Sequence, residues 1–280
     1  MKILLTGATG FLGSCLHEVL RDAGHRVLAA SRREGAGAVT FDLRDGASVA
    51  AIVARTQPDV VIHAAAIADL AACERDPALA FDVNARAAEA LAISALHAGA
   101  RVVLISTDQV FSGERGGYRE ADAPGPVNVY GASKLEAEER VARVHAGALA
   151  LRLPLLYGQS RHERGATATL LAAIERGERP RLFTDEYRSP LSVSDAARAI
   201  GELATSGLAG LYHLGGPCRL SRFELGALIA AQHGFPASAL TPAQAADVPT
   251  PPRRPRDVSL VSDRVRPHLT TRLRAPEEAH

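Results

Sequence analysis

The sequence predicts an α/β fold, namely a Rossmann-type doubly wound parallel sheet with a small C-terminal lobe. Three observations lead to this prediction. Residues 2–5 form a short apolar run that leads into a glycine-rich turn and then into an amphipathic stretch. Apolar segments of strand length alternate with helical segments through the first half of the chain. The segment 102–106 is almost entirely apolar, as expected of a strand covered on both faces.

The composition limits the class of protein. The chain has 280 residues, 47% of them hydrophobic, which suffices for a sizeable core. A net charge of +1 gives no reason to expect a nucleic acid or membrane partner, and no apolar run approaches the roughly 20 residues of a membrane span. The first strand starts at residue 2, which leaves no room for a signal peptide. Cys15, Cys73 and Cys218 lack metal-binding spacing, so we expect a cytoplasmic protein with ordinary core cysteines and no metal site.

The glycine turn has the spacing of a dinucleotide-binding turn. Gly7 permits a tight turn, Gly10 allows a pyrophosphate to approach the backbone, and Gly13 lets the following helix lie close to the strand. The N–H groups at the start of that helix then face the phosphates. The alternative is an ordinary turn, but a strand before it and a helix after it favour a cofactor site. The predicted cofactor-binding residues here are Gly7, Thr9, Gly10, Phe11, Leu12 and Gly13.

The ends of the next three strands add further predicted cofactor contacts. The strand 26–30 ends in Ser31, Arg32 and Arg33, where guanidinium groups suit the 2′-phosphate of NADP better than the free hydroxyls of NAD. A solvated basic turn is the alternative. The strand 39–43 carries Asp42 and Leu43 at its tip, and the strand 60–63 is followed by the small residues Ala64, Ala65 and Ala66.

The remaining elements follow from periodicity and from helix start signals. In the first half, helices are expected at 15–23, 46–56, 77–98 and 130–144, and a sixth strand at 148–153. Beyond it, helices are expected at 167–176, 194–204 and 222–232, with short strands near 182–183, 191–193 and 211–214. We expect these later elements to form a lobe over the C-terminal strand ends, where the substrate binds.

A candidate catalytic group follows the fifth strand. Tyr130 and Lys134 are four residues apart at the start of a predicted helix, so they share one face. An ammonium beside a phenol favours the phenolate, which predicts a lowered Tyr130 pKa and a usable proton donor. Thr107 ends the strand and supplies a hydroxyl at the edge where Rossmann-type sheets bind ligands. The alternative is a structural Tyr and a solvated Lys.

These motifs together resemble those of the extended short-chain dehydrogenase/reductases. The pattern Thr6-Gly-x-x-Gly-x-x-Gly13, the run Ser106-Thr-Asp-Gln-Val-Phe111 and Tyr130-x-x-x-Lys134 are the main matches, and the segments 188–195 and 254–260 extend the resemblance over nearly the whole chain. Within the superfamily, the chain is most similar to the dTDP-4-dehydrorhamnose reductase branch. The resemblance implies a catalytic trio of Thr107, Tyr130 and Lys134, and substrate contacts from Asp108, Gln109 and Arg188.

The chain departs from the branch at two points that concern the substrate. Gln109 stands where the branch usually has Tyr, and the segment 152–157 lacks the Trp that the branch often carries. The chain contains no Trp, so a sugar ring is not stacked in the same way, and the identity of the sugar stays open.

The resemblance implies an NADPH-dependent reductase of a nucleotide-linked keto sugar, with NADH the less favoured cofactor. One alternative is a sugar-nucleotide epimerase or dehydratase, but Gln109 is an amide that accepts no C–H proton. Another alternative is a non-catalytic NADP-binding regulatory subunit similar to the β subunit of methionine adenosyltransferase. The helices 77–98 and 130–144 are candidates for a homodimer interface, although the charged residues of the second helix equally suit solvent.

Three regions are expected. Residues 1–157 form an NADP-binding domain with the catalytic groups, 158–268 form mainly a substrate-binding lobe, and 269–280 form a frayed tail. By composition, residues 248–256 are a linker or disordered. The resemblance instead implies that 253–256 folds back on the lobe.

We predict that the protein binds NADPH at least about tenfold more tightly than NADH, because charge-assisted contacts to the 2′-phosphate contribute roughly 1.5–3 kcal/mol. Titration with both cofactors measures the preference. Replacing Arg32 and Arg33 together by Ala is expected to remove it, and equal affinities in the parent protein would contradict the assignment.

Overall fold

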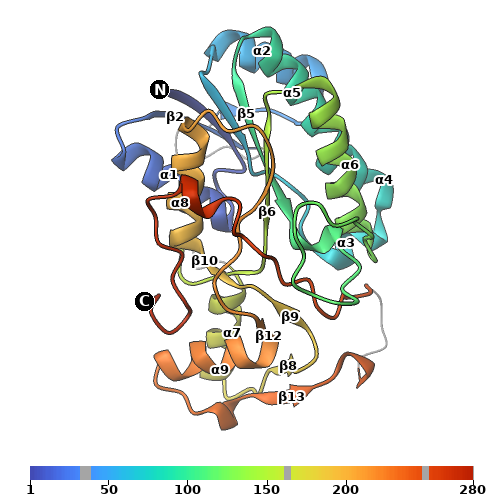
Figure 1. Ribbon diagram of the computed structural model, residues 1–280, viewed down its shortest axis with the longest axis vertical. Coiled ribbons are helices and arrows are strands. Elements are labelled where there is room, and N and C mark those ends of the chain that lie inside the picture. The colour runs from blue at the N-terminus through green and yellow to red at the C-terminus, as the bar shows by residue number, and fades with distance from the viewer. Residues whose placement is uncertain (32–38, 161–164, 248–251, 280) are drawn as a thin grey trace.

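The computed structural model describes residues 1–31, 39–160, 165–247 and 252–279 (Figure 1). Its central sheet contains β1 (Lys2–Thr6), β2 (Arg26–Ser31), β3 (Val39–Thr40), β4 (Val60–His63), β5 (Arg101–Thr107), β6 (Leu149–Leu153) and β11 (Gly210–His213). The seven strands are parallel and lie in the order β11-β6-β5-β4-β1-β2-β3. The chain winds in opposite directions from β1, which creates a ligand crevice at the carboxyl ends of β1 and β4. The predicted fold class is confirmed.

Helices cover both faces of the sheet, and each face has its own apolar core (Figure 1). On one face lie α1 (Phe11–Asp22) and α8 (Val193–Thr205). On the other face lie α2 (Gly46–Thr56), α5 (Ala87–His97) and α6 (Val129–Val144). Every residue of β4 is buried, as a strand with helices on both faces requires.

Two elements expected in the C-terminal lobe belong to the main domain, one as a strand of the sheet and one as a helix that covers it. The strand expected near 211–214 is β11, which pairs with β6 and extends the sheet. The helix expected at 194–204 is α8, which packs against α1 through small and apolar residues such as Ala196 and Ile200. Their hydrophobic patterns were predicted correctly, but a local pattern does not say which apolar surface an element covers.

The expected helix 77–98 is interrupted by a π-helical turn. It consists of α4 (Pro77–Phe81), the π turn η1 (Asp82–Arg86) and α5, and it is preceded by α3 (Leu70–Arg75). The turn brings the buried Asn84 amide to the backbone of Ile67, with hydrogen bonds of 2.8 and 3.0 Å. The same amide donates to the Ser133 hydroxyl at 2.9 Å, so it joins the segment after β4 to α6.

The lobe is smaller than expected and has its own core. It contains α7 (Ala166–Glu175), α9 (Arg222–Gln232) and several short strand pairs. The pairs are β7 (Leu156–Tyr157) with β10 (Leu191–Ser192), β8 (Arg181–Phe183) with β13 (Thr241–Ala243), and β9 (Tyr187–Arg188) with β12 (Leu220–Ser221). Short 3₁₀ turns are η2 (Asp108–Val110), η3 (Ala237–Ala239), η4 (Ala245–Asp247) and η5 (Arg266–His268).

None of the helices in the described ranges has the length and apolar character needed to cross a membrane.

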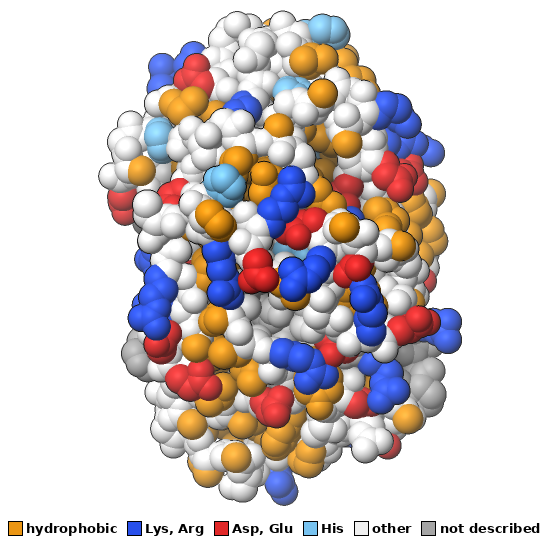
Figure 2. All heavy atoms as spheres, in the orientation of Figure 1, with side chains coloured by type: hydrophobic (Ala, Val, Ile, Leu, Met, Phe, Trp, Pro, Cys, Tyr) orange, Lys and Arg blue, Asp and Glu red, His pale blue; other side chains and the backbone are white. Residues whose placement is uncertain are grey.

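The last part of the chain folds back over the molecule, and the expectation that 269–280 frays is wrong for the residues that are described. Figure 2 shows charged side chains of both signs across the middle of the face that this segment crosses in Figure 1. Arg274 binds the fully buried Asp195 with hydrogen bonds of 2.7–3.2 Å. Burial alone raises the pKa of Asp195, but the bonds from Arg274 and Arg198 hold that pKa below its usual value. Composition suggests a solvated tail, whereas the buried carboxylate supplies an anchor for it.

We predict that Arg274→Ala lowers the free energy of unfolding by about 1–3 kcal/mol, because it removes a partner of a buried carboxylate while Arg198 remains. Urea denaturation measures the loss. Arg272→Ala is the matched control, since the Arg272 side chain is 75% exposed and its ion pair with Glu278 contributes little. Equal stability of the two variants would show that the tail is not anchored by Asp195.

Candidate active site

The glycine turn after β1 is shaped by two close backbone contacts. Gly7 has a φ of 72°, and a Cβ on it would lie 2.7 Å from the Ala65 nitrogen. A Cβ on Gly13 would lie 2.0 Å from the Gly7 oxygen, so α1 is held tightly against the turn. A Cβ on Gly10 would meet only the Gly7 oxygen, at 3.1 Å, and would otherwise point into open space. Gly7 thus forms a tight turn and Gly13 lets α1 lie close to it, and the open space at Gly10 leaves room for the pyrophosphate that the sequence predicts there.

The start of α1 offers its N–H groups to an anion. Gly10 is the N-cap and provides no side-chain cap, and the first turn holds no acidic residue. Leu12 packs against the core, while the Phe11 ring lies so near Gly165 that a Cβ there would be 2.8 Å away. Thr9 is exposed on the turn. This arrangement of the turn and helix fits a bound dinucleotide.

The other predicted cofactor-binding residues differ in burial and in the contacts that they make. Ala64 and Ala65 lie beside Gly7, and the Ala65 N–H donates to Thr6 Oγ1 at 3.3 Å. Ala66 is exposed. The expected strand 39–43 is shorter, because β3 ends at Thr40 and Asp42 and Leu43 follow it in a turn. The Asp42 carboxylate binds Arg44 at 2.6 Å, and Leu43 packs against the core. Ser31 ends β2, whereas Arg32 and Arg33 lie outside the described residues.

The structure places Thr107 and Tyr130 in contact at the end of β5, with Lys134 one turn further along α6. Thr107 is the last residue of that strand, and its hydroxyl forms a hydrogen bond with the Tyr130 phenol. Tyr130 and Lys134 lie on the first two turns of α6. A Cβ on Gly131 would lie 2.1 Å from the Gln109 oxygen, so only a glycine lets α6 begin this close to η2. The catalytic role of the three residues stays a prediction.

The start of α6 is fixed by two side chains that the sequence analysis did not single out. Asn128 is the N-cap and accepts from the Gly131 N–H at 2.8 Å. Glu74, on α3, accepts from the Val129 N–H at 2.9 Å. Asn128 was recognisable as a helix cap from its position, but Glu74 lies 55 residues earlier and carries no local signal.

The expected lowering of the Tyr130 pKa is wrong. Burial raises the pKa of Tyr130 above its usual value, and the hydrogen bond with Thr107 lowers it only in part. Asp108 raises it further, because its negative charge disfavours the phenolate. The Lys134 side chain is also buried, which lowers its own pKa to about 8. The expected lowering of the Tyr130 pKa holds for two groups in water, where neither loses solvation. Burial of both groups reverses the direction.

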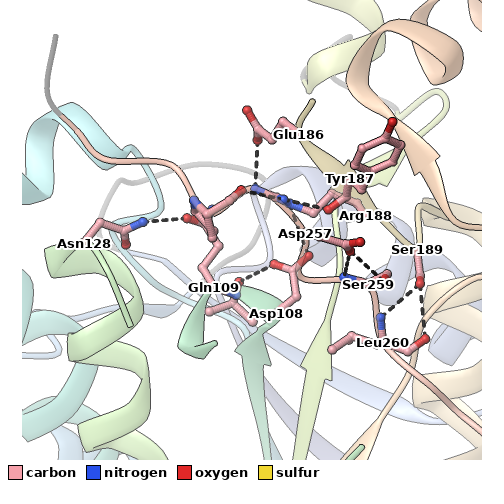
Figure 3. A network of polar contacts seen from close by, with 12 residues as sticks. Asp108, Gln109, Asn128, Glu186, Tyr187, Arg188, Ser189, Asp257, Ser259 and Leu260 are labelled. Carbon is pink, nitrogen blue, oxygen red and sulfur yellow. Dashed lines mark hydrogen bonds and ion pairs between the residues drawn. The ribbon is translucent and has the colours of Figure 1, made fainter. Parts of the chain in front are cut away.

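Asp108 and Arg188, both predicted to bind substrate, form a buried ion pair (Figure 3). Arg188 Nε lies 3.5 Å from Asp108 Oδ2, and Arg188 Nη2 donates to Glu186 at 2.8 Å. Burial raises the pKa of Asp108 to about 6, although the positive charge of Arg188 opposes this. Gln109 accepts from the Asn128 amide at 2.9 Å. Arg188 is therefore a cation shared between two carboxylates.

The segment expected to be either a linker or a folded arm returns to this site. The Arg253 carbonyl accepts from Asn128 at 3.1 Å, and the Pro255 carbonyl accepts from Arg188 at 3.2 Å. The Tyr187 N–H donates to the Arg256 carbonyl at 2.6 Å. Residues 253–256 thus fold back on the lobe, as the resemblance implied. Among the described residues, no group of three His, Cys, Asp or Glu side chains is arranged to hold a metal ion.

The family model of the RmlD substrate binding domain matches residues 1–279. The chain belongs to this family. It is 33% identical to a probable low-salt glycan biosynthesis reductase of Haloferax volcanii, with 100% of this chain and 98% of that protein covered. It is 32% identical to methionine adenosyltransferase 2 subunit beta of Pongo abelii, over 92% of this chain and 80% of that protein.

The solved structures show the same relationship. The dTDP-4-dehydrorhamnose reductase of Bacillus anthracis, determined in complex with NADP, superposes with a TM-score of 0.91 at 27% identity, covering 99% of this chain and 96% of that one. A hypothetical dTDP-4-dehydrorhamnose reductase of Sulfolobus tokodaii superposes with a TM-score of 0.88 at 32% identity, covering 98% and 96%. The resemblance to this branch of the extended short-chain dehydrogenase/reductases is confirmed.

We predict that Gly10→Val abolishes NADPH binding and leaves a folded protein, because the new side chain fills the space at the turn and meets little else. Fluorescence titration with NADPH and circular dichroism measure the two properties. Gly46→Val is the matched control, since a Cβ on Gly46 has no neighbour within 4 Å. NADPH binding by the Gly10 variant at parental affinity would contradict the phosphate site.

Proposed function

We propose that the protein is an NADPH-dependent oxidoreductase that reduces a nucleotide-linked keto sugar. The observation that carries this proposal is the cluster of Thr107, Tyr130 and Lys134 beside a glycine turn with open space at Gly10. The likeness to dTDP-4-dehydrorhamnose reductases, one of them bound to NADP, supports the same reaction class and cofactor. A 4-keto-6-deoxy nucleotide sugar is the first substrate to test.

Each member of the trio has a role in this reaction. Bound NADPH supplies the hydride that reduces the carbonyl carbon, and is itself oxidised to NADP⁺. The Tyr130 hydroxyl donates its proton to the carbonyl oxygen, so that the product is an alcohol. The Thr107 hydroxyl holds the same oxygen, and the Lys134 ammonium holds the cofactor ribose. The raised Tyr130 pKa keeps the phenol protonated at neutral pH, so the proton is present before the reaction.

The substrate contacts proposed for Asp108, Gln109 and Arg188 rest on their place beside the trio. Asp108 lies one residue beyond Thr107, and its charge acts on Tyr130. Gln109 presents an amide where sugar-nucleotide dehydratases need a carboxylate, so we do not propose dehydration. The cofactor contacts of Arg32 and Arg33 stay a prediction from the sequence.

A second candidate function is that of a regulatory subunit that binds NADP without turnover. The specific observation in its favour is the 32% identity to methionine adenosyltransferase 2 subunit beta, which nearly equals the identity to the reductase of Haloferax volcanii. Turnover separates the two functions, because a regulatory subunit has no need of the Tyr130 proton.

We also propose a cytoplasmic location and a homodimer. The three cysteines are unpaired, which suits a reducing compartment. Ile93 and Leu96 on α5 are 39% and 49% exposed, a small apolar area on the helix layer proposed to pair. Light scattering on the purified protein tests the dimer, and a monomeric mass at micromolar concentration would refute it.

We predict that Tyr130→Phe lowers turnover of a 4-keto-6-deoxy nucleotide sugar by about 100-fold or more, the usual effect of losing a general acid. NADPH affinity is expected to stay nearly unchanged, because the ring still packs and only the hydroxyl is lost. Absorbance of NADPH at 340 nm follows turnover, and Tyr187→Phe is the control, because its ring stacks with Arg219 outside the trio. Turnover by the Tyr130 variant at the parental rate would refute the proposed mechanism and favour the regulatory subunit.

A further inference from the structure

The use of lysine in this chain is unusual. Only two lysines, Lys2 and Lys134, occur among 32 lysines and arginines. Lys2 lies near the surface and donates to the Thr56 carbonyl at 2.8 Å, whereas Lys134 is buried on α6, one turn after Tyr130. An arginine stays charged under all conditions, while a buried lysine is a compact group that loses its proton readily. Lys134 is therefore the one buried lysine among the described residues. Its positive charge is lost on burial unless a nearby negative charge stabilises it.

A carboxylate lies one further turn along the same helix face. Tyr130, Lys134 and Glu138 are spaced at four-residue intervals on α6, which places them in one row. Glu138 is 8% exposed and is enclosed between the helix and the sheet. Glutamates on the outer face, such as Glu136, instead bind arginines near the surface.

Two strands hold the Glu138 carboxylate in place. Its Oε1 accepts from the Ser106 hydroxyl on β5, and its Oε2 accepts from Arg152 Nη2 on β6 at 2.7 Å. Arg152 Nε adds bonds of 3.0 and 3.2 Å to the two oxygens. Ser106 and Arg152 face each other directly in the β5–β6 register, so Glu138 binds a matched pair of residues on adjacent strands. Ser106 immediately precedes the catalytic Thr107.

We propose that Glu138 is a positioning residue that keeps the Lys134 ammonium charged and ties the catalytic helix to the end of β5. It does not touch the reacting atoms and acts only through Lys134 and Ser106. Because Ser106 and Arg152 clamp its carboxylate, its negative charge has a fixed position relative to Lys134. The role of that charge in cofactor binding rests on the proposed function, whereas its effect on Lys134 does not.

The other charged groups around Lys134 do not supply this support. His63 at the end of β4 is neutral at working pH, because burial and the charge of Lys134 lower its pKa to about 3. Tyr130 on α6 keeps its proton, and Asp108 on η2 is turned to Arg188. The Arg152 cation binds Glu138 and is paired across the sheet with His213 on β11. Burial lowers the pKa of His213 to about 4.

The direction of the Lys134 pKa agrees with this geometry. Burial lowers the pKa to about 8, and the negative charge of Glu138 is the effect that opposes burial. Without Glu138, the ammonium would lose its proton at a lower pH. The charge would then be lost within the range in which a cytoplasmic enzyme works.

Because the chain has only two lysines, the pKa of Lys134 can be measured directly. Protein labelled with ¹³C at lysine Cε has two side-chain signals, of which Lys2 is an internal reference, and a pH titration by NMR reports the pKa of Lys134. We expect Glu138→Gln to lower that pKa by about one unit or more, a tenfold change in the ratio of ammonium to amine. An unchanged Lys134 pKa in this folded variant overturns the proposal.

Two controls separate charge from packing. Ser106→Ala breaks the tie to β5 but keeps the carboxylate, so the Lys134 pKa is expected to stay within about 0.3 units of the parent value. Glu136→Gln makes the same change of charge on the outer face of α6 and is expected to leave that pKa unchanged. Equal shifts in Glu138→Gln and Glu136→Gln would mean that any nearby charge suffices, which also overturns the proposal.

A double variant covers the case in which Glu138→Gln does not fold because Arg152 is left unpaired. Combining Glu138→Gln with Arg152→Gln removes both charges of the pair, and the Lys134 pKa is again expected to fall. An unchanged pKa in the double variant counts against the proposal in the same way.

Cofactor affinity supplies a second measurement. The dissociation constant of NADPH, measured by fluorescence between pH 6.5 and 8.5, is expected to rise about tenfold more in Glu138→Gln than in the parent. A lowered Lys134 pKa without this change in affinity would keep the role of Glu138 and refute the proposed contact between Lys134 and the cofactor. The NMR result and the proposed function therefore fail separately.

Discussion

The geometry of the site depends on the buried side chain of Asn128. Its carbonyl oxygen caps α6, and its amide nitrogen donates to Gln109 and to the Arg253 carbonyl. One amide thus joins α6, the turn after β5 and the returning C-terminal segment. Because proton and hydride transfer require reacting groups placed to within about an ångström, three segments from distant parts of the chain need such a common reference. A buried amide with these bonds also leaves no unsatisfied donor on its side chain.

Hydrogen bonds also fix the position of the lobe over the sheet, because apolar packing alone does not determine its orientation. The returning segment binds the sheet side through Asp257 N–H to the Gly113 carbonyl at 3.0 Å. It binds the lobe side through the Tyr187 and Arg188 contacts described above. The Tyr118 N–H donates to the Ser259 carbonyl at 2.8 Å and continues this backbone connection. Backbone hydrogen bonds are directional, so they set the position of the lobe where hydrophobic contact would allow sliding.

The sequence was sufficient to predict whatever depends on neighbours along the chain. The glycine turn, the strands of the sheet, the Tyr130–Lys134 spacing and the fold class follow from local pattern, and the structure agrees with them. The Tyr130 pKa was predicted in the wrong direction, because desolvation depends on what surrounds the ring. The tail was expected to fray, because its partner Asp195 lies 79 residues before Arg274. Glu74 and Glu138 were missed for the same reason, since their partners lie on other elements.

The charges beside Arg188 favour a neutral side chain at position 109. One buried cation, Arg188, already serves two carboxylates, Asp108 and Glu186, and burial raises the pKa of Asp108 although the charge of Arg188 opposes this. A carboxylate at position 109, next to Asp108 in the chain, would add a third negative charge at a half-buried position, and partial desolvation of that charge is unfavourable. The neutral Gln109 avoids this cost and still accepts the bond from Asn128. The local charge balance therefore favours an amide at position 109, which agrees with a reaction that needs no carboxylate base there and with the proposed role of Tyr130 as the proton donor.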